Sequence, residues 1–239
     1  MNTNTKSRNN KLYFMISVGM MAALCFVGNY IQIKIPNGVL ITRIHFGNSM
    51  CLLSGLLLGG FGGGLASGIG AGLYDLMDPV YIFSAPFTFL SKFAMGYICG
   101  ELASYFRTRH KGTTLGKTTG ILISGILGQI TYIILYLAKT YLTQIILGYE
   151  VQTAVTATVT NLITSSVNAV IAVAVSVPLY LALRVPLRHT GLASVLNPEL
   201  PPKEEGKKVS PRTIIGIVAF VVLTVAAFVL YIEYKLGNI

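Results

Sequence analysis

Three charged side chains lie in one of the most apolar stretches of the sequence, residues 72–96. They are Asp75, Asp78 and Lys92. A charge at the centre of a bilayer costs roughly 2.5–3.5 kcal/mol, so charges in such a stretch indicate a paired contact or a functional site. Asp75 and Lys92 could form a buried ion pair that fixes two helices, or a polar pocket floor where Lys92 binds an anionic or acceptor group. Lys92 could also extend to water.

Further polar side chains occur in other apolar segments. Tyr132 and Tyr136 are one helical turn apart and share a face, and Asn161 and Asn168 lie on a later polar stripe. Each residue alone is more typical of a contact between helices. Their concentration toward one predicted side favours a small-ligand cavity, which is mostly apolar with a few placed polar groups. The predicted ligand-binding residues are Asn37, Arg43, His45, Asn48, Asp75, Lys92, Tyr132, Tyr136, Asn161 and Asn168.

Composition places these residues in an integral membrane protein. The chain has 239 residues, of which 53% are hydrophobic and 11% charged, and its mean hydropathy is +0.68. Soluble domains carry about 25% charged residues, and a spanning helix needs about 20 apolar ones. The first apolar run, residues 12–33, is too long for the core of a cleavable signal peptide. The net charge of +10 is concentrated between the apolar runs, which argues against nucleic-acid binding.

Charge-free runs predict the membrane spans. The run 46–74 contains GGFGGG at 59–64, which should break it into two short helices. The other spans are expected at 12–34, 83–106, 117–139, 151–183 and 213–232. The sequence therefore predicts an all-α membrane protein with a six-helix core over 1–185. A Pro- and charge-rich linker follows at 186–211, and an additional C-terminal helix at 212–239.

The positive-inside rule predicts the orientation. Thirteen of the 18 Lys and Arg residues lie in the N-terminus, the 107–117 loop and the 184–212 segment. These three segments share one side if the N-terminus is cytoplasmic. The protein is then a multi-pass protein of the cell membrane, and the loops 35–45, 75–82 and 140–150 lie together outside.

Several other kinds of chemistry find little support. His45, Asp75 and Ser84 could form a hydrolase set, but no nucleophile motif accompanies them. No GK[ST] follows the glycines, so they do not form a phosphate loop. The three cysteines lie in apolar runs without CxxC spacing, and their expected role is packing. We therefore expect no catalytic residue, no metal site and no cofactor.

Gly19 and Ala23 form a small-xxx-small pair in the first span. Such pairs let helices approach closely in lipid. The pair either packs within this chain or forms a smooth face that docks on another membrane protein.

The stretch 45–102 resembles one family. It combines an HFGN start, the glycine-rich hairpin, GAGLYDL at 70–76 and APFTFLSKFAMG at 85–96. Together these motifs resemble the substrate-binding S components of energy-coupling factor (ECF) transporters, of the riboflavin type, over residues 12–185. The resemblance implies a six-helix S-component core that holds a vitamin-like ligand near its outer face. It also implies a transmembrane coupling protein and two cytoplasmic ATPases as partners, with docking through Gly19 and Ala23.

Two transport functions remain open. The first is vitamin uptake by an ABC importer, in which this chain captures the substrate. No Walker motif occurs in the chain, so ATP hydrolysis would belong to the partners and the chain itself is expected to be no enzyme. The alternative is an autonomous secondary transporter that uses Asp75 and Lys92 as an ion-coupled pair, although no convincing internal repeat supports it.

Overall fold

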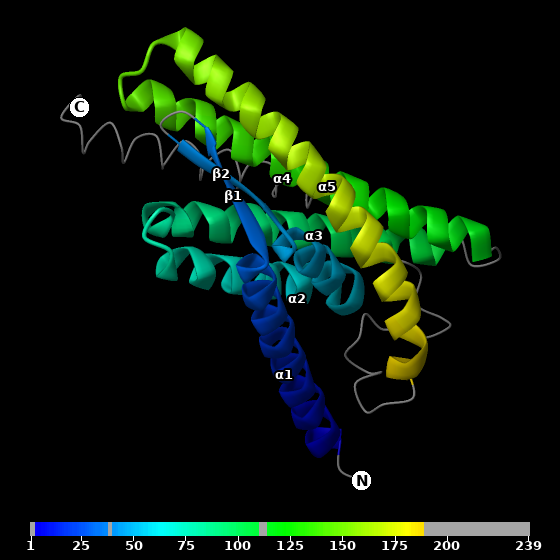
Figure 1. The fold of residues 1–239 in the computed structure, drawn as a ribbon. Helices are drawn as coiled ribbons and strands as arrows, with labels where there is room; N and C mark the ends of the chain where they lie inside the picture. Colours follow the sequence, from blue (N-terminus) through cyan, green and yellow to red (C-terminus); the bar gives the residue numbers. More distant parts are fainter. Residues whose placement is uncertain (1–2, 38–39, 110–113, 189–239) are drawn as a thin grey trace, which may run out of the picture.

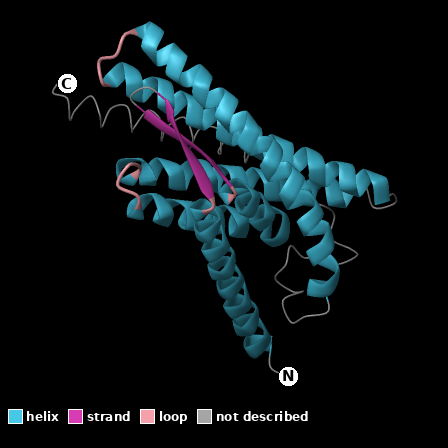
Figure 2. Cartoon of the chain, viewed as in Figure 1, coloured by secondary structure: helices cyan, strands magenta, loops and turns pink. Residues whose placement is uncertain are grey.

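A computed structural model describes residues 3–37, 40–109 and 114–188. The chain forms α1 (Thr3–Tyr30), β1 (Gln32–Asn37), β2 (Leu40–His45), α2 (Gly47–Met77), the short 3-10 helix η1 (Ile82–Ser84), α3 (Ala85–Arg109), α4 (Thr114–Ile146) and α5 (Val151–Arg188). Figure 2 shows that helices dominate the described part of the chain, with one small pair of strands.

Among the described residues, five helices are long and apolar enough to cross a membrane. They are Asn10–Tyr30, Gly47–Met77, Ile82–Arg109, Thr118–Ile146 and Val151–Arg184. The predicted helical membrane fold is therefore confirmed. The predicted domain limits remain a prediction. α5 runs to Arg188, so its last three residues lie in the segment predicted as linker. The rest of the linker and the predicted C-terminal helix lie outside the described residues.

The chain reverses inside α2 at Gly59. This residue has φ 78° and ψ −173°, a conformation open essentially only to glycine. The two halves of α2 then pack against each other, because the Ser54 hydroxyl reaches the Gly63 carbonyl (3.0 Å) and the Ser67 hydroxyl (2.9 Å). The break predicted from GGFGGG therefore lies at its first glycine.

Close packing around this reversal depends on glycines, which have no side chain. A Cβ at Gly63 would lie under 3.0 Å from the backbone of Gly55, and a Cβ at Gly96 would lie 2.7 Å from the Gly63 carbonyl oxygen. Both halves of α2 and α3 thus meet backbone to backbone. Leu52, Leu56 and Met95 are fully buried beside this contact and belong to the main apolar core.

The segment after α1 is a β-hairpin, which the sequence analysis did not predict. α1 ends at Tyr30, before the expected limit of 34, and β1 pairs with β2 in antiparallel register from Gln32↔His45 to Asn37↔Leu40. The segment 31–35 alternates isoleucine with Gln32 and Lys34, a period-two pattern with β-branched residues that favours a strand. The apolar content of this segment led to its assignment as helix.

Two other boundaries differ from the expected spans. α4 continues to Ile146, two turns beyond the predicted end at 139, so most of the expected 140–150 loop is helical. α3 begins at Ala85 with Pro86 in its first turn, where the missing N–H removes no helical hydrogen bond.

The hairpin, the α2–α3 connection and the α4–α5 turn lie at one side of the molecule, which we call the hairpin end (Figure 1). The start of α1 and the end of α5 lie on the other side. The three segments predicted to share a side therefore lie together. Which side of the membrane the hairpin end faces remains a prediction.

Candidate functional site

Arg43 ties the hairpin to the end of α2. Its Nη2 donates to Asp75 Oδ1 at 2.5 Å. Its guanidinium also lies over the rings of Tyr74 and Tyr81, at 5.0 and 4.2 Å from their centroids. A planar guanidinium suits such a position, since it can stack on aromatic faces while it bonds a carboxylate.

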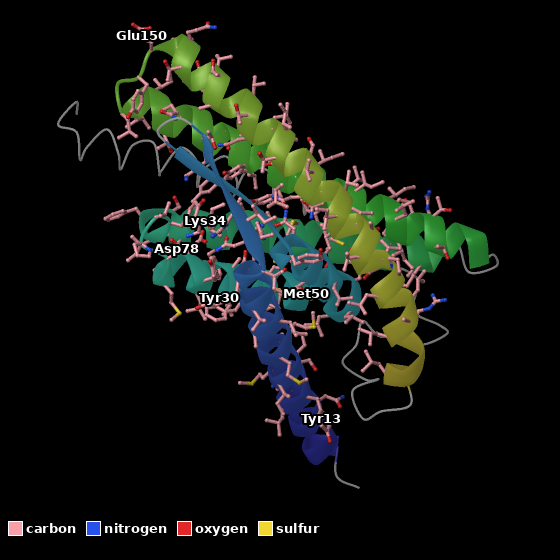
Figure 3. The ribbon with its side chains drawn as sticks, viewed as in Figure 1. Tyr13, Tyr30, Lys34, Met50, Asp78 and Glu150 are labelled. Carbon is pink, nitrogen blue, oxygen red and sulfur yellow. The ribbon has the colours of Figure 1, made fainter. Side chains whose placement is uncertain are left out.

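A second ion pair lies beside the first. Lys34 is the cross-strand partner of Arg43, and two like charges in these positions repel each other. Lys34 Nζ bonds Asp78 Oδ2 at 2.8 Å, and Figure 3 shows the two residues close together at the hairpin end. The two aspartates that close α2 therefore neutralise a cross-strand pair of cations.

Asn168 attaches the hairpin to α5. Its side-chain amide donates to the Arg43 carbonyl at 2.8 Å and accepts from the His45 backbone N–H at 2.9 Å. One amide thus satisfies two backbone groups of β2, as a paired strand would. This contact positions the carboxyl end of β2 between α2 and α5.

A cavity of about 200 Å³ lies where these elements meet. The hairpin, α2, the connection with η1, α3, α4 and α5 all contribute to its wall. The lining residues are Arg43, His45, Asp75, Val80, Tyr81, Ser84, Phe87, Thr88, Ser91, Tyr132, Tyr136, Lys139, Thr140, Thr143, Asn161, Ser165 and Asn168.

Most of the predicted ligand-binding residues line this cavity. Those that do are Arg43, His45, Asp75, Tyr132, Tyr136, Asn161 and Asn168. Asn48 and Lys92 do not belong to the lining and are buried, with 0% and 1% exposure. Asn37 ends β1, and its side chain is not among those that the structure describes.

The structure corrects the expected contact between Asp75 and Lys92. Asp75 bonds Arg43 instead. Lys92 donates to Asn48 Oδ1, and its ammonium lies 3.7 Å from the centroid of the Tyr132 ring. Asn48 in turn donates to Gln129 at 3.3 Å. The expected pairing failed because the hairpin brings a better placed cation to Asp75, and sequence spacing does not show how the hairpin folds.

Several lining residues were absent from the predicted set. Lys139, Thr140 and Thr143 continue the face of Tyr132 and Tyr136 along α4, at intervals of three and four residues. The same spacing from the end of η1 into the start of α3 was a usable signal for Ser84, Phe87, Thr88 and Ser91. The predicted helix end at 139 excluded Thr140 and Thr143 from the stripe on α4.

Burial sets the electrostatics of the hairpin residues. The pKa of His45 is held well below its usual value by burial, reinforced by the positive charges of Lys92 and Arg43, so its imidazole is neutral at physiological pH. Burial would lower the pKa of Arg43, but the charge and hydrogen bond of Asp75, together with Tyr81 and Tyr132, raise that pKa above its usual value. Buried atoms without a hydrogen-bond partner among the described residues include Arg43 Nη1, His45 Nδ1 and Thr143 Oγ1, and buried polar groups ordinarily have one.

Comparison with known families gives a match over residues 9–185 to the ECF-type riboflavin transporter S component. The chain belongs to this family. A solved structure, that of the S component of a bacterial ECF transporter, matches with 22% sequence identity and a TM-score of 0.46, over 74% of this chain and 99% of that chain. Comparison with curated proteins gave no significant match.

Membership explains the character of the site. An ECF S component is a substrate-binding subunit for transport and not an enzyme, and this S component accordingly combines a membrane-embedded helical fold with a cavity at one end. Stacked Tyr132 and Tyr136, with ring centroids 5.7 Å apart, offer the cavity an aromatic wall. Amide, hydroxyl and charged groups surround it, an arrangement that can orient a small polar ligand.

Proposed function

We propose that this chain captures a water-soluble vitamin or vitamin precursor, such as riboflavin or pyridoxine, for an ECF-type ABC importer. The ligand enters from the outer face and binds in the cavity at the hairpin end. Residue by residue, the proposed binding set is Arg43, His45, Asp75, Tyr132, Tyr136, Asn161 and Asn168. The observation that carries the proposal is the convergence of these seven residues from four elements on one cavity.

We place the hairpin end outside and the N-terminus in the cytoplasm of a cell-membrane protein. The support is the distribution of basic residues, since Arg107 and Arg109 end α3 at the end opposite the cavity. Lys34 and Arg43, the cations on the hairpin, are instead neutralised by aspartates. Lys and Arg residues near the ends of membrane-spanning helices favour the cytoplasmic side.

The proposed partners are a transmembrane coupling protein and two cytoplasmic ATPases, which would supply the energy that this chain has no motif to supply. Gly19 and Ala23 on α1 are exposed, and a Cβ at Gly19 would meet no atom within 4 Å. Within the described part of the chain, Gly19 is therefore open on this face. We propose that this face docks on the coupling protein.

The alternative is an autonomous ion-coupled transporter. Its motivation was a direct contact between Asp75 and Lys92, which the structure replaces with the Arg43–Asp75 and Lys92–Asn48 contacts. Uptake that depends on the ATPase partners would favour the importer. Uptake by this chain alone, driven by an ion gradient, would favour the alternative.

Mass spectrometry of small molecules that co-purify in mild detergent tests the ligand class. Titration of the emptied protein with riboflavin, pyridoxine and thiamine then gives affinities. Binding of riboflavin can be followed by the change in flavin fluorescence. Because the chain has no tryptophan, aromatic stacking on the flavin in this cavity would come from its tyrosine and phenylalanine side chains. Recovery of lipid and detergent alone, with no affinity for any vitamin in the panel, would refute the proposal.

A matched pair of variants locates the site. We expect Tyr136→Leu to raise the Kd of the bound vitamin at least about tenfold, or about 1.4 kcal/mol, because it removes the stacked wall. Tyr13→Leu removes an exposed tyrosine of α1, far from the hairpin end (Figure 3), and should leave the Kd unchanged. Equal effects of the two substitutions would place the site elsewhere.

A further inference from the structure

The cavity wall contains a lysine that has no carboxylate partner. Lys139 of α4 lines the cavity, and its Nζ bonds the Ser84 hydroxyl at 2.8 Å. No carboxylate of the described residues lies within ion-pair distance of it. An ammonium has three donors, so this contact leaves Lys139 able to bind an acceptor inside the cavity.

A second lysine lies behind the wall. Lys92 is 1% exposed, and its ammonium is sandwiched between Asn48 and the ring of Tyr132, a lining residue. It too has no ion-pair partner among the described residues. A buried charge without a counter-ion costs several kcal/mol, so the protein maintains positive charge beneath the cavity at the expense of stability.

The acidic residues of the described chain do not balance these two lysines. Asp75 and Asp78 are engaged by Arg43 and Lys34. Glu101 lies against Gly60, beside the reversal of α2. Glu150 lies in the α4–α5 turn, away from Lys34 and Asp78 (Figure 3), and does not line the cavity. Two positive charges at the cavity therefore have no protein counter-ion among the described residues.

From this imbalance we infer that the ligand carries an anionic group, a carboxylate or a phosphate monoester. The inference rests on the proposed function, because it takes the cavity as the ligand site. The anion binds Lys139 directly, while Lys92 stabilises it from behind Tyr132. Arg43 Nη1, which has no hydrogen-bond partner among the described residues, supplies a further donor. In a partly desolvated site, one such charge pair contributes more than it would in water.

Ligand pairs that differ in the anionic group alone test this inference. Riboflavin and riboflavin 5′-phosphate share one fluorophore and differ by a phosphate. Pyridoxine, pyridoxine 5′-phosphate and 4-pyridoxic acid extend the comparison and separate phosphate from carboxylate. We expect the Kd of an anionic member to be at least tenfold lower than that of its neutral partner, and to rise with ionic strength while the neutral Kd stays constant.

Four variants at three lysines show where the preference originates. Lys139→Met should bring the ratio of the neutral Kd to the anionic Kd close to one. Lys139→Arg keeps the positive charge and should restore most of the preference for the anionic ligand. Lys92→Met should reduce the ratio as well. Lys34→Met removes a lysine that is paired with Asp78 and does not line the cavity, so it should keep the wild-type ratio.

The outcomes separate the inference from the proposed function. Neutral vitamins that bind as tightly as their anionic partners overturn the inference and leave the vitamin-capture proposal standing. No affinity for any member of these pairs refutes the proposed function itself. A lower melting temperature in Lys139→Met with an unchanged Kd ratio would assign Lys139 a purely structural role and also overturn the inference.

Discussion

At the scale of single residues, the site depends on polar groups whose partners come from distant parts of the chain. Arg43 meets Asp75, 32 residues away, and Asn168 holds the backbone of Arg43 and His45. Each contact fixes the end of the hairpin against a different helix. The hairpin therefore forms one wall of the cavity because a few side chains hold it there.

His45 makes the stability of this wall depend on pH. Its folded-state pKa lies well below 6.5, the ordinary value for histidine, so the unfolded chain binds more protons below pH 6.5. The free energy of unfolding should therefore fall as the pH drops below about 6.5, by at most about 1.4 kcal/mol per pH unit from this group. Thermal melts of wild type and His45→Gln between pH 7.5 and 5 measure the contribution as the difference in slope.

The charges that act on His45 are those of Lys92 and Arg43, and Asp75 and Lys139 line the same cavity. Wild type and His45→Gln share all four groups. Identical slopes for wild type and His45→Gln would contradict the buried, neutral state of this imidazole.

At the scale of elements, the reversal of α2 at Gly59 determines how the bundle packs. It turns one apolar run into two antiparallel helical segments, and α3 packs against both through Gly96. Asp75 and Tyr74 at the end of the second segment thereby reach the hairpin. The glycines thus position the site although none of them lines it.

Two glycine-to-alanine substitutions test this packing. Gly63→Ala should destabilise the fold by about 1–3 kcal/mol, because the new methyl group would overlap the backbone of Gly55. Gly125→Ala places its methyl group 3.7 Å from Val173, an ordinary contact, and should be neutral or stabilising by up to about 1 kcal/mol. Detergent-based thermal melts compare them, and equal melting temperatures would argue against the close approach at Gly63.

At the scale of the whole molecule, the proposed ligand site and the proposed docking face occupy different surfaces. The cavity lies at the hairpin end, whereas Gly19 and Ala23 lie on an exposed face of α1. Large apolar side chains such as Met15, Met20 and Val27 are exposed along the same helix, as expected of a helix surrounded by lipid or by another membrane protein. The two functions should therefore be separable by substitution.

Gly19→Leu provides this separation. The added side chain meets no atom of this chain near its Cβ, so the melting temperature and the vitamin Kd should match those of wild type. Co-purification with the coupling protein and ATP-dependent uptake should fall at least tenfold. Met20→Leu changes a neighbouring exposed residue at similar volume and should keep both properties. Normal uptake by Gly19→Leu would remove this face from the docking surface.

The sequence by itself determined the features that depend on local chemistry. Hydropathy identified the membrane-embedded helices, the glycines predicted the break at 59–64, and seven of ten proposed binding residues line the cavity. The helices and the break were predictable because apolar length and backbone freedom act within one segment, whereas ligand binding by the seven lining residues stays a prediction. The hairpin at 32–45 was missed because its isoleucines suit a membrane helix as well as a strand.

The tertiary structure alone decided which groups pair and which remain without a counter-ion. Spacing placed Asp75 and Lys92 near the same end. In the structure, however, the docked hairpin pairs Arg43 with Asp75. Lys92 instead contacts Asn48 and the Tyr132 ring. A side chain bonds the partner that the fold brings within about 3 Å. That partner comes from a segment 32 or 44 residues away. Local sequence patterns do not show how segments so far apart in the chain align with each other.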